Sequence, residues 1–244
     1  PCKDRKRCRE SLLPLAAKSL GIPYDIKEIS CPVLGGQRCS CVLQPKAILA
    51  VEVGQALCPK AGQTVSGDTA AIFQLPGREL GLAISDGMGT GEAAHRESTL
   101  ALKLLERFLQ TGLTSTMALK IVNTAMILFS EQETFATLDL VIINQVTGET
   151  EFIKAGGAPS LIWSRGNFQV ITAGMPPAGI LDQFEPKSFS KTLYPQDVLI
   201  SMSDGAWEAL EALDGRSEWL ENLMQQLSLE KPDRIAEYLL YLAQ

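Results

Sequence analysis

The chain has 244 residues, of which 45% are hydrophobic, and it carries a formal net charge of −6. This size suits one large domain with a small extension, and the acidic balance argues against a nucleic-acid-binding protein, which presents a basic surface. No apolar run reaches the roughly 20 residues that span a bilayer, so we expect no membrane contact by this part of the chain.

The first 45 residues form a leader whose composition differs from that of residues 46–244. The N-terminus lacks an initiator Met and the apolar stretch of a signal peptide, so we expect a cut within a longer chain. "RESLLPLAAKSLG" predicts a short helix ending near Gly21, and "YDIKEIS" and "RCSCVL" predict a hairpin. All six cysteines precede residue 59 without a C-x-x-C pair. Reduced thiols are therefore favoured over a metal or redox site.

Beyond the leader, the pattern passes from strands to helices. "AILAVEVGQAL" predicts a long strand, and "GDTAAIFQLP" and "ELGLAIS" predict a hairpin about the turn "PGR". A broad apolar face predicts a helix over residues 92–110, which Gly112 ends, and a second helix follows over residues 114–129.

The remainder predicts strands and then helices. "FATLDLVIINQ", "TGETEFIKAGG" and "PSLIWSRGNFQVI" predict strands joined by turns, and "FEPKSFSKTL" and "DVLISMS" predict two more. Two helices, over about 217–227 and 233–243, end the chain. This order indicates an α+β fold with two packed, mainly antiparallel β-sheets flanked by α-helices, an αββα sandwich.

Four aspartates lie in or beside apolar strand-like runs, where Asp is uncommon and a buried carboxylate is costly unless paired or metal-bound. They are Asp68, Asp86, Asp139 and Asp204. One interpretation is local turn chemistry, in which Asp starts a turn and the following Gly supplies a positive φ. The other is a hard cation such as Mg²⁺ or Mn²⁺ held by converging carboxylates and a Gly carbonyl. A Ser-Asp-Gly repeated after two separate strands strengthens the second interpretation.

Other catalytic classes fit the sequence poorly. With one His and no usable Cys set, a His/Cys metal centre is nearly excluded. His95 lies on a predicted helix, and the sequence has no G-x-S-x-G of a serine hydrolase. The run Gly87–Gly91, "GMGTG", lacks the Walker Lys-Ser/Thr pair and does not match G-x-G-x-x-G, so it is a weak signal for a phosphate-binding loop.

The segments "VSGDTAAIF", "AISDGMGTGEAAHRES", "ATLDL", "GGAPS" and "ISMSDG" occur in an order that resembles the type 2C superfamily of metal-dependent protein phosphatases. Within that superfamily, "DGMGTGEAAHRES" followed by "TLDL" is similar to the stage II sporulation protein E family. The resemblance covers about residues 46–244. It implies a phosphatase domain with two Mn²⁺ or Mg²⁺ ions at one end of a two-sheet sandwich.

The resemblance also implies roles for individual residues. Asp86 resembles the carboxylate that bridges both metals, Gly87 the residue whose carbonyl holds the second metal, and Asp204 a ligand of the first. Asp68 resembles the outer-shell acid that positions metal-bound water. Asp139 is either a nearby shell residue or, slightly favoured, a structural polar group in the core. Two metals neutralise a phosphoserine dianion and activate water, so no Cys or His nucleophile is needed.

One segment departs from this family pattern. The last metal ligand of the family lies in an Asp-Asp-x-Thr segment on a C-terminal strand, whereas this sequence stops at "AEYLLYLAQ", a predicted helix. We therefore expect a fold without its C-terminal strand, a weak or absent metal at the first site, and weak or no activity. A non-catalytic phosphatase-like signalling or scaffold module is the alternative, against which the intact upstream acids argue.

Partners and location also follow from the resemblance. The substrate would be a small phosphorylated anti-anti-sigma factor whose dephosphorylation releases a sigma factor in sporulation. The domain would be cytoplasmic, in a longer protein anchored in the bacterial inner membrane or sporulation septum, with residues 1–45 leading from a preceding regulatory region. The helices over 92–110 and 114–129 begin at the proposed ligands, so they are a candidate regulatory switch and homodimer contact. The candidate switch residues are Glu92, His95 and Glu97.

Overall fold

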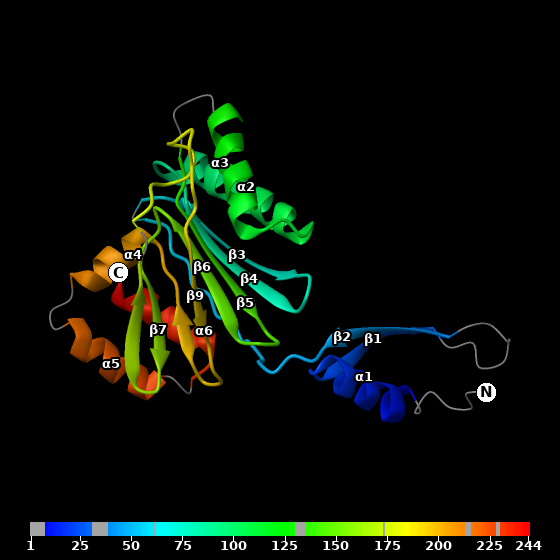
Figure 1. The fold of residues 1–244 in the computed structure, drawn as a ribbon. Coiled ribbons are helices and arrows are strands. Elements are labelled where there is room, and N and C mark those ends of the chain that lie inside the picture. The colour runs from blue at the N-terminus through cyan, green and yellow to red at the C-terminus, as the bar shows by residue number, and fades with distance from the viewer. Residues whose placement is uncertain are drawn as a thin grey trace.

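The structure, a computed structural model, describes residues 8–30, 39–60, 62–129, 135–172, 174–212, 216–227 and 230–244. Figure 1 shows two stacked β-sheets with helices on both outer sides. One sheet has five strands in the order β3-β4-β5-β6-β9, and the other has three in the order β10-β7-β8. The α+β sandwich expected from the sequence is confirmed.

The five-stranded sheet is antiparallel throughout. Its strands are β3 (Asp68–Leu75), β4 (Glu79–Asp86), β5 (Leu138–Asn144), β6 (Glu149–Ala155) and β9 (Ser188–Thr192). Side chains alternate between its two faces, as strand geometry requires. Leu138 and Leu140 of β5 pack toward the helices, whereas Val141 and Ile143 pack toward the other sheet.

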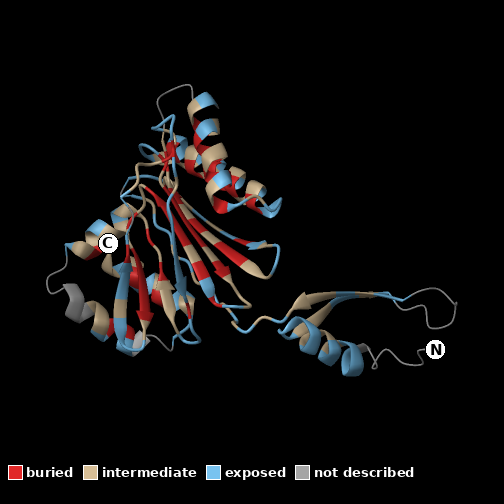
Figure 2. Cartoon of the chain, viewed as in Figure 1, coloured by how far each residue is buried: buried red, intermediate tan, exposed pale blue. Residues whose placement is uncertain are grey.

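Two helices cover the outer face of the five-stranded sheet, α2 (Gly91–Gln110) and α3 (Ser115–Phe129). The apolar face predicted for α2 buries Leu102, Leu105 and Leu109 against the sheet. Figure 2 shows this buried stripe in red, together with the buried inner strands. Because β4 leads into α2 over only four residues, the end of β4 and the start of this helix are held at one end of the sandwich.

The second sheet contains β7 (Ser160–Ser164), β8 (Asn167–Ile171) and β10 (Val198–Ile200). Its outer face packs on α4 (Asp204–Glu211), α5 (Arg216–Leu227) and α6 (Pro232–Leu242), with a core that includes Trp163 and Met224. Between the two sheets lies a third core, in which Phe152 of one sheet meets Ile162 of the other.

Two predictions about local structure are wrong. The segment Ala47–Leu57 forms no strand, because no neighbouring strand pairs with it in the described part of the chain; only Ile48 and Leu49 donate backbone hydrogen bonds, to the carbonyl of Gln145. The second Ser-Asp-Gly also does not close a strand. Instead β10 ends at Ile200, and Asp204 begins the additional helix α4.

The leader contains α1 (Leu13–Leu20) after a π-helical turn, and the paired strands β1 (Tyr24–Ser30) and β2 (Ser40–Pro45). Figure 1 shows these elements set apart from the sandwich. The predicted turn between the two strands lies outside the described residues. Asp25 of β1 lies 3.7 Å from Arg78 in the β3–β4 turn, which links leader and sandwich.

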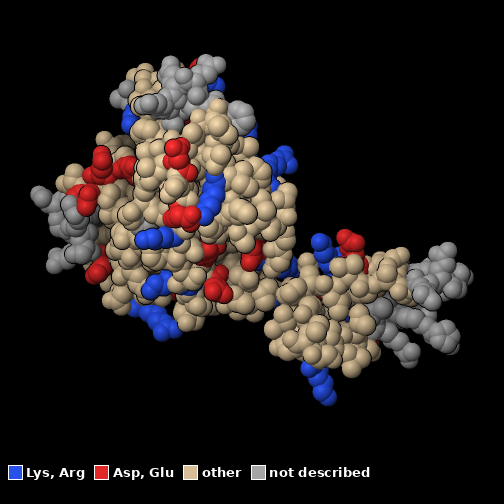
Figure 3. All heavy atoms as spheres, turned by 45° about the horizontal axis from the view of Figure 1, so that its top comes forward, with Lys and Arg blue, Asp and Glu red and all other residues tan. Residues whose placement is uncertain are grey.

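Charged side chains of both signs are interspersed on the face of the molecule shown in Figure 3. Among the described residues, no helix combines the length and apolar character needed to cross a membrane.

Candidate active site

Asp68 and Asp86 lie directly opposite each other on β3 and β4, at the end of the sheet where α2 begins. The backbone of Asp86 is fixed by Thr137, which precedes β5. The Asp86 amide donates to the Thr137 hydroxyl at 2.9 Å, and the Thr137 amide donates to the Asp86 carbonyl at 2.9 Å. The β3–β4 hairpin therefore holds the carboxylates of Asp68 and Asp86 side by side, although 18 positions separate them in the sequence.

The second sheet brings a third aspartate to the same end. Ser203 donates its hydroxyl proton to the Asp68 carboxylate at 2.8 Å, and Asp204 follows it as the first residue of α4. Burial raises the pKa of Asp204 whereas the backbone of Ala158, in the loop before β7, lowers it, and the charge of Asp204 acts on both Asp68 and Asp86. The structure therefore brings together the predicted residues Asp68, Asp86 and Asp204.

The two Ser-Asp-Gly segments place their glycines in different surroundings. A Cβ on Gly87 would collide with the backbone of Ala94, because the first turns of α2 pack directly on the end of β4. A Cβ on Gly205 would meet no atom within 4 Å. Only the first glycine is required by close packing.

This contrast predicts different outcomes for the same substitution. Gly87→Ala should push α2 away from β4 and lower both stability and metal affinity, with a stability loss of about 1–3 kcal/mol as for other overpacked sites. Gly205→Ala is the matched control, and it should be neutral or slightly stabilising because Ala favours the helix. Thermal unfolding and Mn²⁺ titration of both variants measure this. Equal behaviour of the two variants would contradict the close-packing argument.

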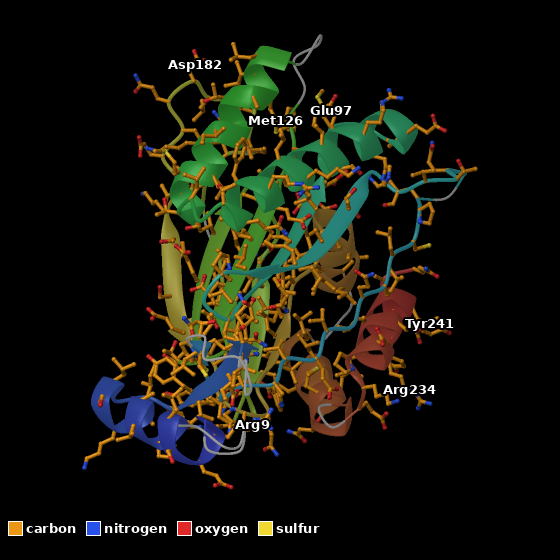
Figure 4. The ribbon with its side chains drawn as sticks, turned by 90° about the vertical axis from the view of Figure 1, so that its right-hand side faces the viewer. Arg9, Glu97, Met126, Asp182, Arg234 and Tyr241 are labelled. Atoms are coloured by element: carbon orange, nitrogen blue, oxygen red, sulfur yellow. The ribbon has the colours of Figure 1, made fainter. Side chains whose placement is uncertain are left out.

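Polar contacts attach the first half of α2 to the residues before Asp68. His95 Nδ1 lies 3.1 Å from the Ser66 carbonyl, and Ser98 donates to the Gly67 carbonyl at 2.6 Å. Figure 4 shows α2 and α3 lying over the sheet, with Glu97 on α2. Glu92 is exposed near the start of the same helix. Of the three candidate switch residues, His95 therefore contacts the Ser-Gly-Asp segment, whereas within the described part of the chain no contact of Glu92 or Glu97 supports such a role.

Negative charge is concentrated at this end of the sandwich. Burial raises the pKa of Asp86 to about 7, with further contributions from the neighbouring Asp68 and Asp204, whereas Lys60 opposes the shift. Burial also raises the pKa of Asp204, reinforced by Glu208 and Asp68. Neighbouring carboxylates raise one another's pKa because their negative charges repel. A bound cation would relieve this repulsion, so such a cluster favours cation binding.

The raised pKa of Asp86 predicts a pH-dependent stability of the metal-free protein. Between its ordinary value of 3.8 and about 7, the folded state binds a proton that the unfolded state releases. Its contribution is therefore complete below that window and is lost as pH rises through about 7. Asp86→Asn has no such proton, so its stability advantage over the wild type in EDTA should grow from pH 5 to pH 8. A constant difference in urea unfolding would contradict the assignment.

The donor set fits a hard divalent cation. Carboxylates of Asp86 and Asp204 and the carbonyl of Gly87 are oxygen donors of the kind that Mg²⁺ and Mn²⁺ prefer, with water completing the shell. In the described part of the chain, however, no group of three or more His, Cys, Asp or Glu side chains could hold a metal ion. The residues thus offer oxygen ligands for a hydrated ion, not a closed protein cage.

Asp139 lies deeper in the sandwich, next to Lys154. The two residues are directly opposite on β5 and β6 and form an ion pair between the sheets. Burial raises the pKa of Asp139, and Lys154 opposes the shift. Sequence reasoning missed Lys154, although a lysine within the apolar run "EFIKA", paired with a strand that carries an aspartate, was a usable signal. It also missed the contacts of Thr137 and Ser203, which depend on the three-dimensional arrangement.

This chain is similar to known proteins of one family. Residues 76–244 match the family model described as "Stage II sporulation protein E (SpoIIE)". Stage II sporulation protein E of Priestia megaterium is 33% identical over 239 residues, covering 98% of this chain and 41% of that protein. The protein of the same name from Bacillus subtilis (strain 168) is 36% identical over 190 residues, covering 78% of this chain and 23% of that protein. The chain thus spans less than half of the length of either relative.

A solved structure also resembles this chain over almost its whole length. It is the PP2C phosphatase domain with a fragment of the regulatory domain of the cell fate determinant SpoIIE from Bacillus subtilis. The TM-score is 0.79 at 30% sequence identity, and the match covers 96% of this chain and 70% of that one.

Proposed function

Because this chain belongs to the stage II sporulation protein E family of PP2C-type phosphatases, we propose that it is a metal-dependent protein serine/threonine phosphatase. The site would bind two Mn²⁺ or Mg²⁺ ions, with Asp86 bridging them, the Gly87 carbonyl holding one and Asp204 holding the other. When bound, such ions neutralise phosphate charge and lower the pKa of a bound water so that it can attack phosphorus.

The residues of the chain would orient this reaction. Ser203 holds one carboxylate oxygen of Asp68 at 2.8 Å, which fixes the rotamer of that side chain opposite Asp86. Asp68 would accept a hydrogen bond from the attacking water. This hydrogen bond would direct the water toward the phosphoserine ester. The Thr137 contacts would keep the Asp86 backbone, and with it the Gly87 carbonyl, in a fixed direction.

The proposed substrate is a small phosphorylated anti-anti-sigma factor, and its dephosphorylation would control sigma-factor activation in sporulation. We also propose that the protein acts as a homodimer and that α2 and α3 transmit a regulatory signal. The contacts of His95 and Ser98 with Ser66 and Gly67 support this, because movement of α2 would displace the segment that carries Asp68. A cytoplasmic domain of a protein anchored in the bacterial inner membrane or sporulation septum is the corresponding location.

The observation that carries the proposal is the convergence of Asp68, Asp86 and Asp204, from both sheets, at one end of the sandwich. The test is phosphate release from a phosphoserine form of an anti-anti-sigma protein. A protein whose reading frame continues past Gln244 should be used beside the 244-residue chain, with Mn²⁺ or with EDTA. Mn²⁺-dependent release by the longer protein is expected. Absence of release from both would contradict the proposal.

A non-catalytic signalling module is the second candidate. It is favoured by the finding that, among the described residues, no three-ligand acidic group could hold a metal. Such a module would bind the phosphorylated protein without releasing phosphate, with or without Mn²⁺. The same assay therefore separates the two functions when substrate binding is measured in parallel.

A further inference from the structure

Lys154 is the buried charge that the proposed reaction leaves unexplained. Its side chain is 0% exposed and its partner Asp139 is 3% exposed, so both charges are removed from water. Replacing a buried ion pair by apolar residues of similar volume is often neutral or stabilising, so the pair is weak evidence for a role in stability alone. The question is what this lysine does that an apolar side chain could not.

The ammonium group of Lys154 has a second partner besides Asp139. It donates a hydrogen bond to the carbonyl oxygen of Ala158 at 2.6 Å, and the backbone of the same residue stabilises the charge of Asp204. One loop residue therefore connects the buried lysine to a proposed metal ligand. An apolar side chain could fill the space but could not hold the carbonyl.

The loop that carries Ala158 is also fixed by the other member of the ion pair. Ser160 donates to the Asp139 carboxylate at 3.5 Å, and its oxygen lies 2.9 Å from that of Ser201, three residues before Asp204. A Cβ on Gly157 would lie 3.2 Å from the Cβ of Asp139, so the loop passes close to this side chain. The ion pair is thus connected to Asp204 by a second route, through Ser160 and Ser201.

We propose that Lys154 is a positioning residue for Asp204, acting through Ala158, with Asp139 holding the ammonium group in place. The inference rests on the proposed function, in which Asp204 is a metal ligand. Residues that orient a ligand typically change metal affinity about 10- to 100-fold when they are replaced. A purely structural pair would change stability and leave metal affinity unaltered.

The test uses the double variant Asp139→Leu/Lys154→Met, which removes both charges and keeps an apolar, space-filling pair. In metal-free protein, hydrogen exchange of the Ala158 amide should become faster, while the strands β5 and β6 keep their protection. In Mn²⁺ titration calorimetry of the longer protein that continues past Gln244, affinity should fall about 10- to 100-fold. Phe152→Leu is the matched control, because Phe152 is fully buried on the same face of β6. That variant should lose stability but keep wild-type Mn²⁺ affinity.

A double-mutant cycle with Asp204→Ala locates the effect. If Lys154 acts through Asp204, the apolar pair should weaken Mn²⁺ binding in the wild-type background and change it little in the Asp204→Ala background. The inference would be overturned if the folded double variant kept the Mn²⁺ affinity of the wild type and its rate of hydrogen exchange at the Ala158 amide. It would also be overturned if the losses of Mn²⁺ affinity caused by the apolar pair and by Asp204→Ala were additive. Failure of the proposed function has a different signature, since the longer protein that continues past Gln244 would then release no phosphate with Mn²⁺.

Discussion

Replacing Asp86 with Asn is expected to lower Mn²⁺-dependent phosphatase turnover by about 10³-fold or more. This corresponds to the loss of several kcal/mol of transition-state stabilisation by the metal ions. The same variant should be more stable than the wild type in EDTA at pH 8, because it removes a half-buried charge that Asp68 and Asp204 repel. Turnover of a phosphoserine substrate and urea unfolding measure the two effects. Activity and stability should thus change in opposite directions.

The control for Asp86→Asn is Asp182→Asn, because Asp182 is exposed and lies in the loop near the top of the view in Figure 4. It should change neither turnover nor stability measurably. If Asp86→Asn instead lowered activity only in proportion to a loss of folded protein, Asp86 would be a structural residue and the site assignment would fail.

Replacing Lys154 with Met is expected to lower the free energy of unfolding by about 3–5 kcal/mol, because it leaves the Asp139 charge buried without its partner. One oxygen of Asp139 already has no hydrogen-bond partner. For a domain of this size the melting temperature should fall by roughly 10 °C. Adding Asp139→Leu should restore most of the lost stability, since the unpaired charge is then gone.

An exposed ion pair supplies the comparison. Lys120 and Glu185 approach to 2.7 Å, but their side chains are 37% and 79% exposed. Lys120→Met should therefore cost no more than about 1 kcal/mol. A similar melting temperature for Lys120→Met and Lys154→Met would show that burial does not control the cost, contrary to the argument from desolvation.

The layers of this fold were predictable because local patterns determine them. The apolar stripe of Leu102, Leu105 and Leu109 has helical spacing, so that helix has one face to bury, whereas the short apolar run "LDLVIIN" is typical of a strand that is buried on both faces. Turn residues such as Gly148, with a positive φ, marked where hairpins reverse. These signals are contained within a few residues of sequence.

The features that were missed depend on residues far apart in the sequence. The segment Ala47–Leu57 has strand-like composition, but a strand also needs a neighbour, which composition does not reveal. The approach of Asp204 to Ala158, and of Lys154 to Asp139, depends on the pairing and stacking of sheets. The family resemblance named the acids of the site, yet only the arrangement in space shows that a buried lysine lies behind one of them.

The central claim, that Asp86, Gly87 and Asp204 hold catalytic metal ions, is tested most directly by diffraction at the manganese absorption edge from crystals grown with Mn²⁺. The account predicts an anomalous peak at coordination distance from the Asp86 carboxylate and the Gly87 carbonyl, and loss of that peak in Asp86→Asn crystals. Well-diffracting crystals with no peak at this end of the sandwich, or with a peak that persists in the variant, would contradict it.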